Sequence, residues 1–183
     1  MSLSLDRDKE WLQNVRRLPS PNLDDRAGDT TIDTIVIHGI SLPPKEYGGP
    51  FIDQLFTNQL DCNAHPYFQG ITDLRVSSHL LIDRAGEITQ YVPFSARARH
   101  AGVSTFQGRQ DCNEFSIGIE LEGCDDEPYE QRQYEVLAGV VRLLLSEWPA
   151  ITRERIVGHS DIAPERKTDP GPAFDWDYFF SLI

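Results

Sequence analysis

The chain has 183 residues, of which 39% are hydrophobic and 25% are charged, and its 17 Lys and Arg are outnumbered by 29 Asp and Glu, giving a formal net charge of −12. These proportions are typical of a globular protein with one core and argue against a disordered chain. Because polyanion binding requires a basic surface, the charge also argues against a nucleic-acid or anionic-membrane partner.

The cysteines and the apolar segments indicate the cellular compartment. Cys62, Cys112 and Cys124 are an odd number with no CxxC pair, which argues against a disulfide scaffold and for a reducing compartment. The chain starts without a basic segment followed by an apolar run, so we expect no signal peptide. Its longest apolar stretch, residues 136–146, is interrupted by Arg142 and is too short to span a bilayer. We expect a cytoplasmic protein that acts as a monomer.

The first third of the chain predicts three elements. Apolar side chains at helical spacing predict a short amphipathic helix over residues 8–17, which Pro19 and Pro21 end. Residues 31–40 are rich in β-branched side chains and predict a strand that is buried on both faces. Residues 51–60 are compatible with a helix.

The remaining elements alternate between strands and helices. Residues 78–83 and 87–92 flank a glycine-containing turn and predict a hairpin, and residues 116–121 predict another strand. Residues 131–148 carry apolar side chains three and four apart and give the strongest helix prediction, and residues 151–159 predict a turn and a short strand. This order predicts an α/β or α+β fold, a single domain with a mixed central sheet flanked by helices.

The five histidines differ in their placement along these elements. His38 and His159 each end a strand-like apolar run, which is where α/β folds place ligands and catalytic groups. His65 precedes a proline and suits a turn, His79 lies in a predicted strand and could simply pack, and His100 lies in a loop that could border a cleft. For any single histidine, a packed or surface position is the more common outcome.

The predicted loop at residues 160–173 is dense in charged side chains and stiffened by prolines. Asp169 precedes Pro170, which restricts its backbone and helps to aim its carboxylate. Two neutral imidazoles, here His38 and His159, and one carboxylate form a known catalytic zinc set with a fourth position open to water. The pattern alone fits a solvated charged turn equally well.

A family resemblance decides between these alternatives. It rests on five motifs in this order: Val-Ile-His at 36–38, Asn-Ala-His-Pro-Tyr-Phe at 63–68, His-Ala-Gly at 100–102, Ser-Ile-Gly-Ile-Glu-Leu-Glu-Gly at 116–123, and Gly-His-Ser-Asp-Ile-Ala-Pro-Glu-Arg-Lys-Thr-Asp-Pro-Gly at 158–171. Together they resemble the AmpD-type cytosolic N-acetylmuramoyl-L-alanine amidases, which belong to the zinc amidase superfamily that includes peptidoglycan recognition proteins. The match runs from about residue 11 to residue 176, and its last motif is long and specific.

The resemblance implies a Zn²⁺ cofactor and a role for each matching residue. Glu120 matches the acidic residue that activates water, Lys167 the basic residue that stabilises the oxyanion, and Tyr67 an active-site tyrosine. The implied reaction cleaves the amide between 1,6-anhydro-N-acetylmuramic acid and L-alanine of a muropeptide during cell-wall recycling. Three residues match the zinc ligands: His38, His159 and Asp169.

Some of these roles have plainer alternatives in the sequence alone. Glu122 shares the strand face of Glu120, and Lys167 could be an ordinary surface lysine. For the carboxylates of the muropeptide we expect bidentate arginines, and we select Arg75 and Arg109 because both lie near the matching motifs, although each could equally be a surface arginine.

The sequence departs from the family pattern at two positions near the motifs. Gly39 stands where relatives often carry Asn, and Arg99 stands where Trp usually precedes His-Ala-Gly. Neither change removes a proposed zinc ligand. A non-catalytic muropeptide-binding module on the same fold is the alternative function. A cysteine hydrolase using Cys112 or Cys124 has little support, because neither has an obvious histidine partner.

Overall fold

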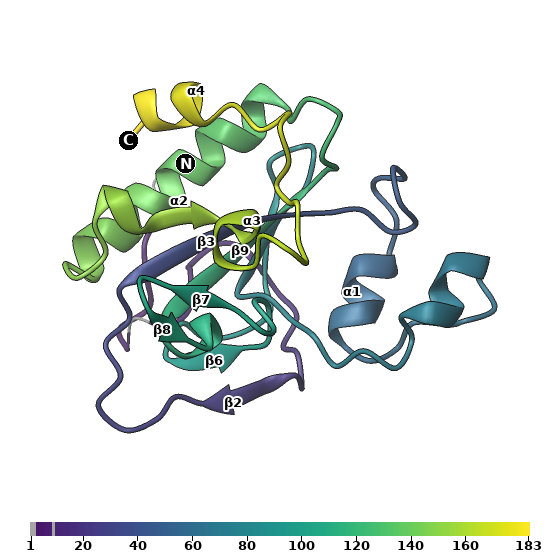
Figure 1. The fold of residues 1–183 in the computed structure, drawn as a ribbon, viewed down its shortest axis with the longest axis horizontal. Helices are drawn as coiled ribbons and strands as arrows, with labels where there is room; N and C mark the ends of the chain where they lie inside the picture. Colours follow the sequence, from purple (N-terminus) through teal and green to yellow (C-terminus); the bar gives the residue numbers. More distant parts are fainter. Residues whose placement is uncertain (1–2, 9) are drawn as a thin grey trace.

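The computed structural model describes residues 3–8 and 10–183. Its centre is a six-stranded mixed sheet in the order β1-β5-β4-β9-β3-β10. The adjacent strands β3 and β9 are labelled at the middle of Figure 1. Two further pairs, β2 with β6 and β7 with β8, lie beside it. The strands are β1 Arg16–Arg17, β2 Leu23–Asp25, β3 Thr34–Ile40, β4 Leu80–Ile82, β5 Ile88–Gln90, β6 Ala96–Ala98, β7 Thr105–Phe106, β8 Arg109–Gln110, β9 Ser116–Glu122 and β10 Ile156–Gly158.

One face of the sheet is covered by the long helix α2 and by α4, which lie together in Figure 1. Helix α1 lies at the right of Figure 1, away from α2 and α4, and packs near the segment that holds η1. The sheet and these helices form a mixed α/β domain, as the alternation of elements predicts. The helices are α1 Phe51–Phe56, α2 Gln131–Glu147, α3 His159–Ile162 and α4 Trp176–Ser181, with 3₁₀ turns η1 Pro66–Gly70, η2 Cys112–Glu114 and η3 Arg153–Arg155.

The alternation of side chains along β9 separates the core from the site. Ile117, Ile119 and Leu121 point to the α2 side and are fully buried in the largest hydrophobic cluster. The alternate positions point to the opposite face, and β9 pairs in parallel with β3 so that Glu120 lies beside His38. The strand therefore buries apolar side chains on one face and presents polar side chains on the other.

Several predicted elements are confirmed with small shifts of their ends. The hairpin forms between β4 and β5, and the helix predicted at residues 131–148 is α2. Helix α1 ends at Phe56, earlier than predicted, because Asn58 adopts a left-handed conformation with φ 60°. The segment predicted as loop begins with one helical turn, α3, whose start is capped by the Asp161 carboxylate accepting from the Gly158 N–H at 2.7 Å.

The predicted helix over residues 8–17 is wrong; residue 9 lies outside the described part of the chain. Instead, the Asp6 carboxylate accepts the backbone N–H groups of Glu10 and Trp11, and the chain then pairs as β1 with β5. Leu12 is fully buried, and its N–H donates to the Gln90 side chain at 2.7 Å. Tertiary hydrogen bonds at the sheet edge replace the helical ones that the apolar spacing predicts.

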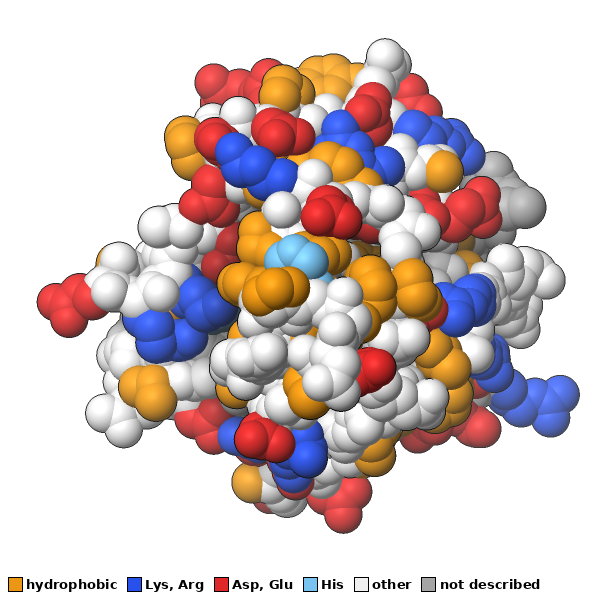
Figure 2. Space-filling model, turned by 90° about the vertical axis from the view of Figure 1, so that its right-hand side faces the viewer, with side chains coloured by type: hydrophobic (Ala, Val, Ile, Leu, Met, Phe, Trp, Pro, Cys, Tyr) orange, Lys and Arg blue, Asp and Glu red, His pale blue; other side chains and the backbone are white. Residues whose placement is uncertain are grey.

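Two properties of the surface bear on possible partners. Among the described residues, no helix is both long and apolar enough to cross a membrane. On the face shown in Figure 2, Lys and Arg side chains are intermixed with Asp and Glu instead of forming one large patch of a single sign.

Candidate active site and metal centre

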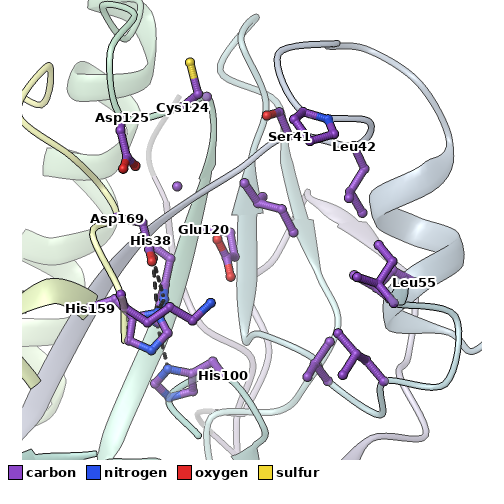
Figure 3. Close-up of a pocket in the computed structure, with 18 of the residues that line it drawn as sticks. His38, Ser41, Leu42, Leu55, His100, Glu120, Cys124, Asp125, His159 and Asp169 are labelled. Atoms are coloured by element: carbon purple, nitrogen blue, oxygen red, sulfur yellow. Dashed lines mark hydrogen bonds and ion pairs between the residues drawn. The ribbon is translucent and has the colours of Figure 1, made fainter. Parts of the chain in front are cut away.

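A cavity of about 760 Å³ opens over the polar face of β3 and β9. Figure 3 shows side chains from four separate parts of the chain converging at its base. They come from paired positions of β3 and β9, from the start of α3 and from the loop that follows α3. His38 therefore lies within β3, which continues to Ile40, and not at its end as the sequence predicts. The proposed ligands, the proposed catalytic residues and Tyr67 all line this cavity: His38, Tyr67, Glu120, His159, Lys167 and Asp169.

Three of these side chains bring one donor atom each to a single point. His38 Nδ1 lies 2.9 Å from His159 Nδ1, and Asp169 Oδ2 lies 3.2 Å and 3.1 Å from these two nitrogens. Both imidazoles are buried, whereas the Asp169 side chain is 14% exposed. All three side chains line the cavity, and the Asp169 carboxylate is the most exposed of them.

The spacing of these atoms fits a tetrahedral zinc ion. Bonds of 2.0–2.2 Å at tetrahedral angles place ligand atoms about 3.3–3.6 Å apart, a few tenths of an ångström more than the three separations observed. His159 Nε2 lies 3.1 Å from the Ala101 carbonyl oxygen, which can only accept a hydrogen bond. A neutral His159 therefore carries its hydrogen on Nε2 and directs the Nδ1 lone pair into the cluster.

The imidazole of His38 is held neutral by its surroundings. Burial, and then the neighbouring His159, lowers the pKa of His38 to about 4, although Asp169 opposes this. A neutral imidazole is the form that binds a metal ion, so the ligand needs no deprotonation at neutral pH.

Glu120 lies beside the cluster with one carboxylate oxygen unpartnered. Its side chain is buried, and Oε2 has no hydrogen-bond partner among the described residues. Burial raises the pKa of Glu120 well above its usual value, and the charge of Asp169 adds to this, while Lys167 opposes it. A buried carboxylate oxygen aimed at an open cavity is costly to maintain, which points to a function that uses it.

Glu122 shares the strand face of Glu120 but has a different role. Its two carboxylate oxygens accept the backbone N–H groups of Gly48, at 2.6 Å, and of Arg84, at 3.2 Å. Glu122 therefore holds two loops in place, while Glu120 faces the cavity. These contacts distinguish the two carboxylates, which the sequence pattern alone does not.

Lys167 and Tyr67 lie at the cavity wall. Lys167 is partly buried, and among the described residues no carboxylate forms an ion pair with it. Tyr67 is 46% exposed and follows His65, whose Nδ1 accepts the Tyr67 N–H at 3.2 Å. His65 therefore has the turn role that its position before a proline predicts.

The two arginines selected for substrate carboxylates are not among the residues that line the cavity. Arg75 is exposed and donates to the carbonyl oxygens of Thr72 and Leu74 on its own loop. Arg109 pairs with Asp33 at 2.5 Å and lies over the Phe115 ring. The structure does not bring either side chain to the cluster, because proximity in sequence to the motifs does not imply proximity in space.

Other cations line the cavity in their place. Arg99 donates to both carboxylate oxygens of Asp24, at 2.9 Å and 2.7 Å, and Lys45 pairs with Asp126 at 2.7 Å. In the sequence, Arg99 stands out only as a departure from the family pattern, and nothing marks Lys45 as a cavity residue. Each pairs with an aspartate that is distant in the sequence, so no local sequence pattern predicts that Arg99 or Lys45 lines the cavity.

The structure explains why a glycine stands at position 39. A Cβ atom there would overlap the Tyr129 hydroxyl, which donates to the Pro170 carbonyl oxygen at 2.9 Å. This hydrogen bond ties the loop that carries Asp169 to the rest of the fold. A larger residue at position 39 is therefore incompatible with this anchor.

The cysteines show no catalytic arrangement. Cys112 is fully buried in a small hydrophobic cluster, and Cys124 contacts the Tyr47 hydroxyl and the Asp126 carboxylate. Within the described residues, no hydrogen bond joins either thiol to a histidine. All three cysteines are free thiols.

Sequence comparison and structure comparison both match this chain to AmpD amidases. The chain is 58% identical over 176 residues to the 1,6-anhydro-N-acetylmuramyl-L-alanine amidase AmpD of Citrobacter freundii, covering 96% of this chain and 94% of that one. The crystal structure of a selenomethionine AmpD derivative is 57% identical and superposes with a TM-score of 0.95, covering 98% of this chain and 99% of that one.

A more distant structure matches as well. The amidase AmiD of Escherichia coli, in complex with anhydro-N-acetylmuramic acid-L-Ala-D-γ-Glu-L-Lys, is 28% identical with a TM-score of 0.62, covering 99% of this chain and 65% of that one. Residues 28–172 match the family described as N-acetylmuramoyl-L-alanine amidase and include every residue of the cluster. With this match and the close relatives, the chain belongs to the N-acetylmuramoyl-L-alanine amidase family of hydrolases.

Proposed function

We propose that this protein is a zinc-dependent hydrolase of the amide bond between 1,6-anhydro-N-acetylmuramic acid and the L-alanine of a muropeptide. The bond and the sugar are those in the name of the 58% identical AmpD of Citrobacter freundii, and the AmiD complex holds a substrate of this class. The observation that carries the proposal is the convergence of His38, His159 and Asp169 beside the unpartnered carboxylate oxygen of Glu120.

His38, His159 and Asp169 would hold the zinc ion. When bound, the ion would act as a Lewis acid: it would lower the pKa of a water molecule to about 7 and would polarise the amide carbonyl. The first requirement on the protein is to keep the three donor atoms unprotonated and close together. The separations of 2.9–3.2 Å among the three donor atoms, and the burial that lowers the pKa of His38, support this role.

Glu120 is the proposed proton carrier. Its Oε2 takes one proton from the attacking water as the water oxygen bonds to the lactyl carbonyl carbon. The same proton then passes to the alanine nitrogen as the carbon–nitrogen bond breaks, which leaves a lactyl carboxylic acid and a free peptide amine. The acid then loses its remaining proton to the amine or to solvent and becomes a carboxylate. The raised pKa of Glu120 suits both transfers, because the carboxyl accepts a proton readily and still releases it to an amine.

Lys167 is the proposed partner of the developing oxyanion. Its ammonium lines the same cavity, and no carboxylate among the described residues neutralises it. A preorganised charged donor at this position favours the tetrahedral transition state over the planar amide. Tyr67, Arg75 and Arg109 remain proposed substrate contacts, of which only Tyr67 lines the cavity.

We also propose that the protein acts in the cytoplasm as a monomer, on wall fragments taken up for recycling. Three free cysteines suit a reducing compartment. A net charge of −12 disfavours adhesion to anionic wall polymers, and thus favours small fragments as the substrate. The whole chain of residues 1–183 is proposed to serve this one catalytic domain.

Mass spectrometry of a digest tests the proposed reaction. Zinc-loaded protein is incubated with anhydromuramoyl-L-Ala-D-γ-Glu-diaminopimelate, and the products are compared with those of the Glu120→Gln variant. The proposal predicts free tripeptide and anhydro-N-acetylmuramic acid from the wild type only. Binding of the intact muropeptide by calorimetry without cleavage would instead establish the non-catalytic binding module.

A further inference from the structure

The second ring nitrogen of His38 leads into a chain of buried hydrogen bonds behind the proposed metal centre. His38 Nε2 lies 2.9 Å from His100 Nδ1, and His100 Nε2 lies 3.1 Å from the Ser116 hydroxyl oxygen. The Ser116 hydroxyl in turn lies 2.5 Å from the Cys112 carbonyl oxygen. All three side chains are at most 8% exposed, so water does not compete for these bonds.

The direction of each bond follows from the last acceptor. A carbonyl oxygen can only accept, so the single Ser116 hydrogen is donated to Cys112. The Ser116 oxygen must then accept the hydrogen of His100 Nε2. His100 is buried, and among the described residues no carboxylate contacts its ring, so the neutral imidazole with that one hydrogen is the form that fits these bonds.

The hydrogen bond between His100 and His38 fixes the tautomer of His38. With its hydrogen on Nε2, His100 presents a lone pair on Nδ1, and this lone pair accepts from His38 Nε2. His38 therefore carries its hydrogen on Nε2 and directs the Nδ1 lone pair towards His159 and Asp169. Without this chain, neutral imidazole could place its hydrogen on either nitrogen.

The neighbouring residue performs the same task for the other histidine ligand. The Ala101 carbonyl oxygen accepts from His159 Nε2 at 3.1 Å. The buried Asn113 side chain accepts the N–H groups of both His100 and Ala101, at 2.9 Å and 2.7 Å, and so anchors the segment. Two consecutive residues thus set the tautomers of both imidazole ligands.

Strand β9 makes room for this arrangement. A Cβ atom at Gly118 would overlap the His100 ring, so the strand admits the imidazole only because position 118 has no side chain. Gly118 and Ser116 lie on the same face of β9 as Glu120. One strand therefore carries the proposed proton carrier, the space for His100 and the acceptor that orients it.

We propose that His100 and Ser116 are positioning residues that lock His38 in its Nε2–H tautomer and so prepare Nδ1 as a metal ligand. This inference rests on the proposed zinc site formed by His38, His159 and Asp169. Partners of the non-coordinating nitrogen in general raise the basicity of a histidine ligand and fix its orientation. Simple packing is the competing role, because the His38 and His100 rings also make an edge contact with centroids 5.0 Å apart.

The first test is made on the metal-free wild-type protein and requires no substitution. Long-range ¹H–¹⁵N correlation spectra of histidine-labelled protein distinguish the two neutral tautomers. The proposal predicts the Nε2–H tautomer for His38 and His100. An Nδ1–H tautomer, or a mixture, at His38 overturns it, whether or not the protein binds zinc.

The second test measures zinc affinity by competition with a chromogenic chelator. His100→Leu removes the acceptor and is predicted to weaken zinc binding by about 10–100-fold. His100→Asn keeps an acceptor near the position of Nδ1 and is predicted to recover most of that loss. Unchanged affinity in His100→Leu, or an equal loss in both variants, shows that the ring only packs and overturns the proposal.

Serine variants provide a milder pair with a matched control. Ser116→Ala is predicted to weaken zinc binding about tenfold and to give His100 mixed tautomers. Ser78→Ala removes another buried hydroxyl, which donates to the Gly118 carbonyl oxygen at 2.8 Å, and is predicted to leave zinc affinity unchanged. Equal effects of the two serine variants contradict the proposal. If the wild type itself binds no zinc, the proposed metal centre fails, and the tautomer spectra still decide the role of His100.

Discussion

At the scale of single residues, the site assigns different tasks to side chains of the same type. His38 and His159 each direct one nitrogen to the cluster and use the other to contact the His100–Ala101 segment. Glu120 and Glu122 lie two residues apart on β9, yet one faces the cavity and the other holds two loops. The contacts of each residue, and not its type, separate the reactive groups from the structural ones.

Replacement of Glu120 by Gln tests its assignment as the proton carrier. The variant keeps the size of the side chain but cannot accept a proton, so we predict a fall in kcat of about 10²–10⁴-fold with zinc still bound. Glu122→Gln is the matched control and is predicted to lose stability while keeping most of its kcat. Steady-state kinetics and metal analysis of both variants provide the measurement; loss of zinc from Glu120→Gln would mean that Glu120 is a ligand instead.

Replacement of Lys167 by Met tests the proposed oxyanion contact. Because a charged donor there acts mainly in the transition state, we predict a fall in kcat of about 10²–10³-fold with little change in KM. Lys45 also lines the cavity but is paired with Asp126, so Lys45→Met is predicted to change kcat little. A rise in KM alone for Lys167→Met would assign Lys167 to substrate binding.

At the scale of elements, β9 and α2 form the main packing unit beneath the site. Helix α2 buries one apolar stripe on the sheet, and the side chains of β9 that face it are fully buried. The opposite face of β9 carries the groups of the site. The stability of this packing therefore supports the geometry of the cavity without contributing any atom to it.

Two adjacent leucines of α2 test this packing. Leu144 is fully buried, whereas Leu145 is only partly buried at the edge of the same cluster. We predict that Leu144→Ala lowers the free energy of unfolding by about 2–5 kcal/mol and that Leu145→Ala lowers it clearly less. Urea denaturation of the two variants and the wild type measures this, and equal losses would contradict the observed orientation of the helix.

The sequence predicts these elements better than it predicts the contacts between them. The period of α2 and the β-branched run of β3 are local patterns, and both elements form where they are predicted. The first helix prediction fails because the buried hydrogen bond between Leu12 and Gln90 joins residues 78 positions apart. Arg109 pairs with Asp33, 76 positions away, and does not line the cavity, and such a long-range ion pair leaves no periodic signal in the sequence.

At the scale of the whole molecule, the net charge of −12 makes anionic substrates depend on local cations. The cavity contains Lys45, Arg99 and Lys167, but aspartates already pair with the first two. Lys167 is therefore the cavity lysine that remains available to a substrate oxygen among the described residues. An anionic substrate oxygen would therefore be bound by one lysine in the cavity and not by a basic surface that attracts polyanions.

Buried neutral histidines predict how stability depends on pH. Burial, then the charge of Arg26, lowers the pKa of His79 to about 3, below its ordinary value of 6.5. Between these values the unfolded chain binds a proton that the folded chain does not, so His79 makes the free energy of unfolding fall as pH decreases from about 6.5 towards 3.

Urea denaturation across this pH range checks the prediction. We expect His79→Gln to be less stable at pH 7 but to lose less stability on acidification than the wild type does. His65→Gln makes the same change at a histidine in a turn and serves as the matched control. Parallel curves for the wild type and His79→Gln would contradict a buried neutral His79.

The most direct test of the proposed metal centre is a zinc titration of metal-free protein during turnover. After removal of metal with a chelator, we predict that cleavage of the anhydromuramoyl amide is lost and returns in proportion to added zinc until one ion is bound per chain. His159→Ala is predicted to show no such recovery. Full cleavage by the metal-free wild type would contradict a zinc centre formed by His38, His159 and Asp169.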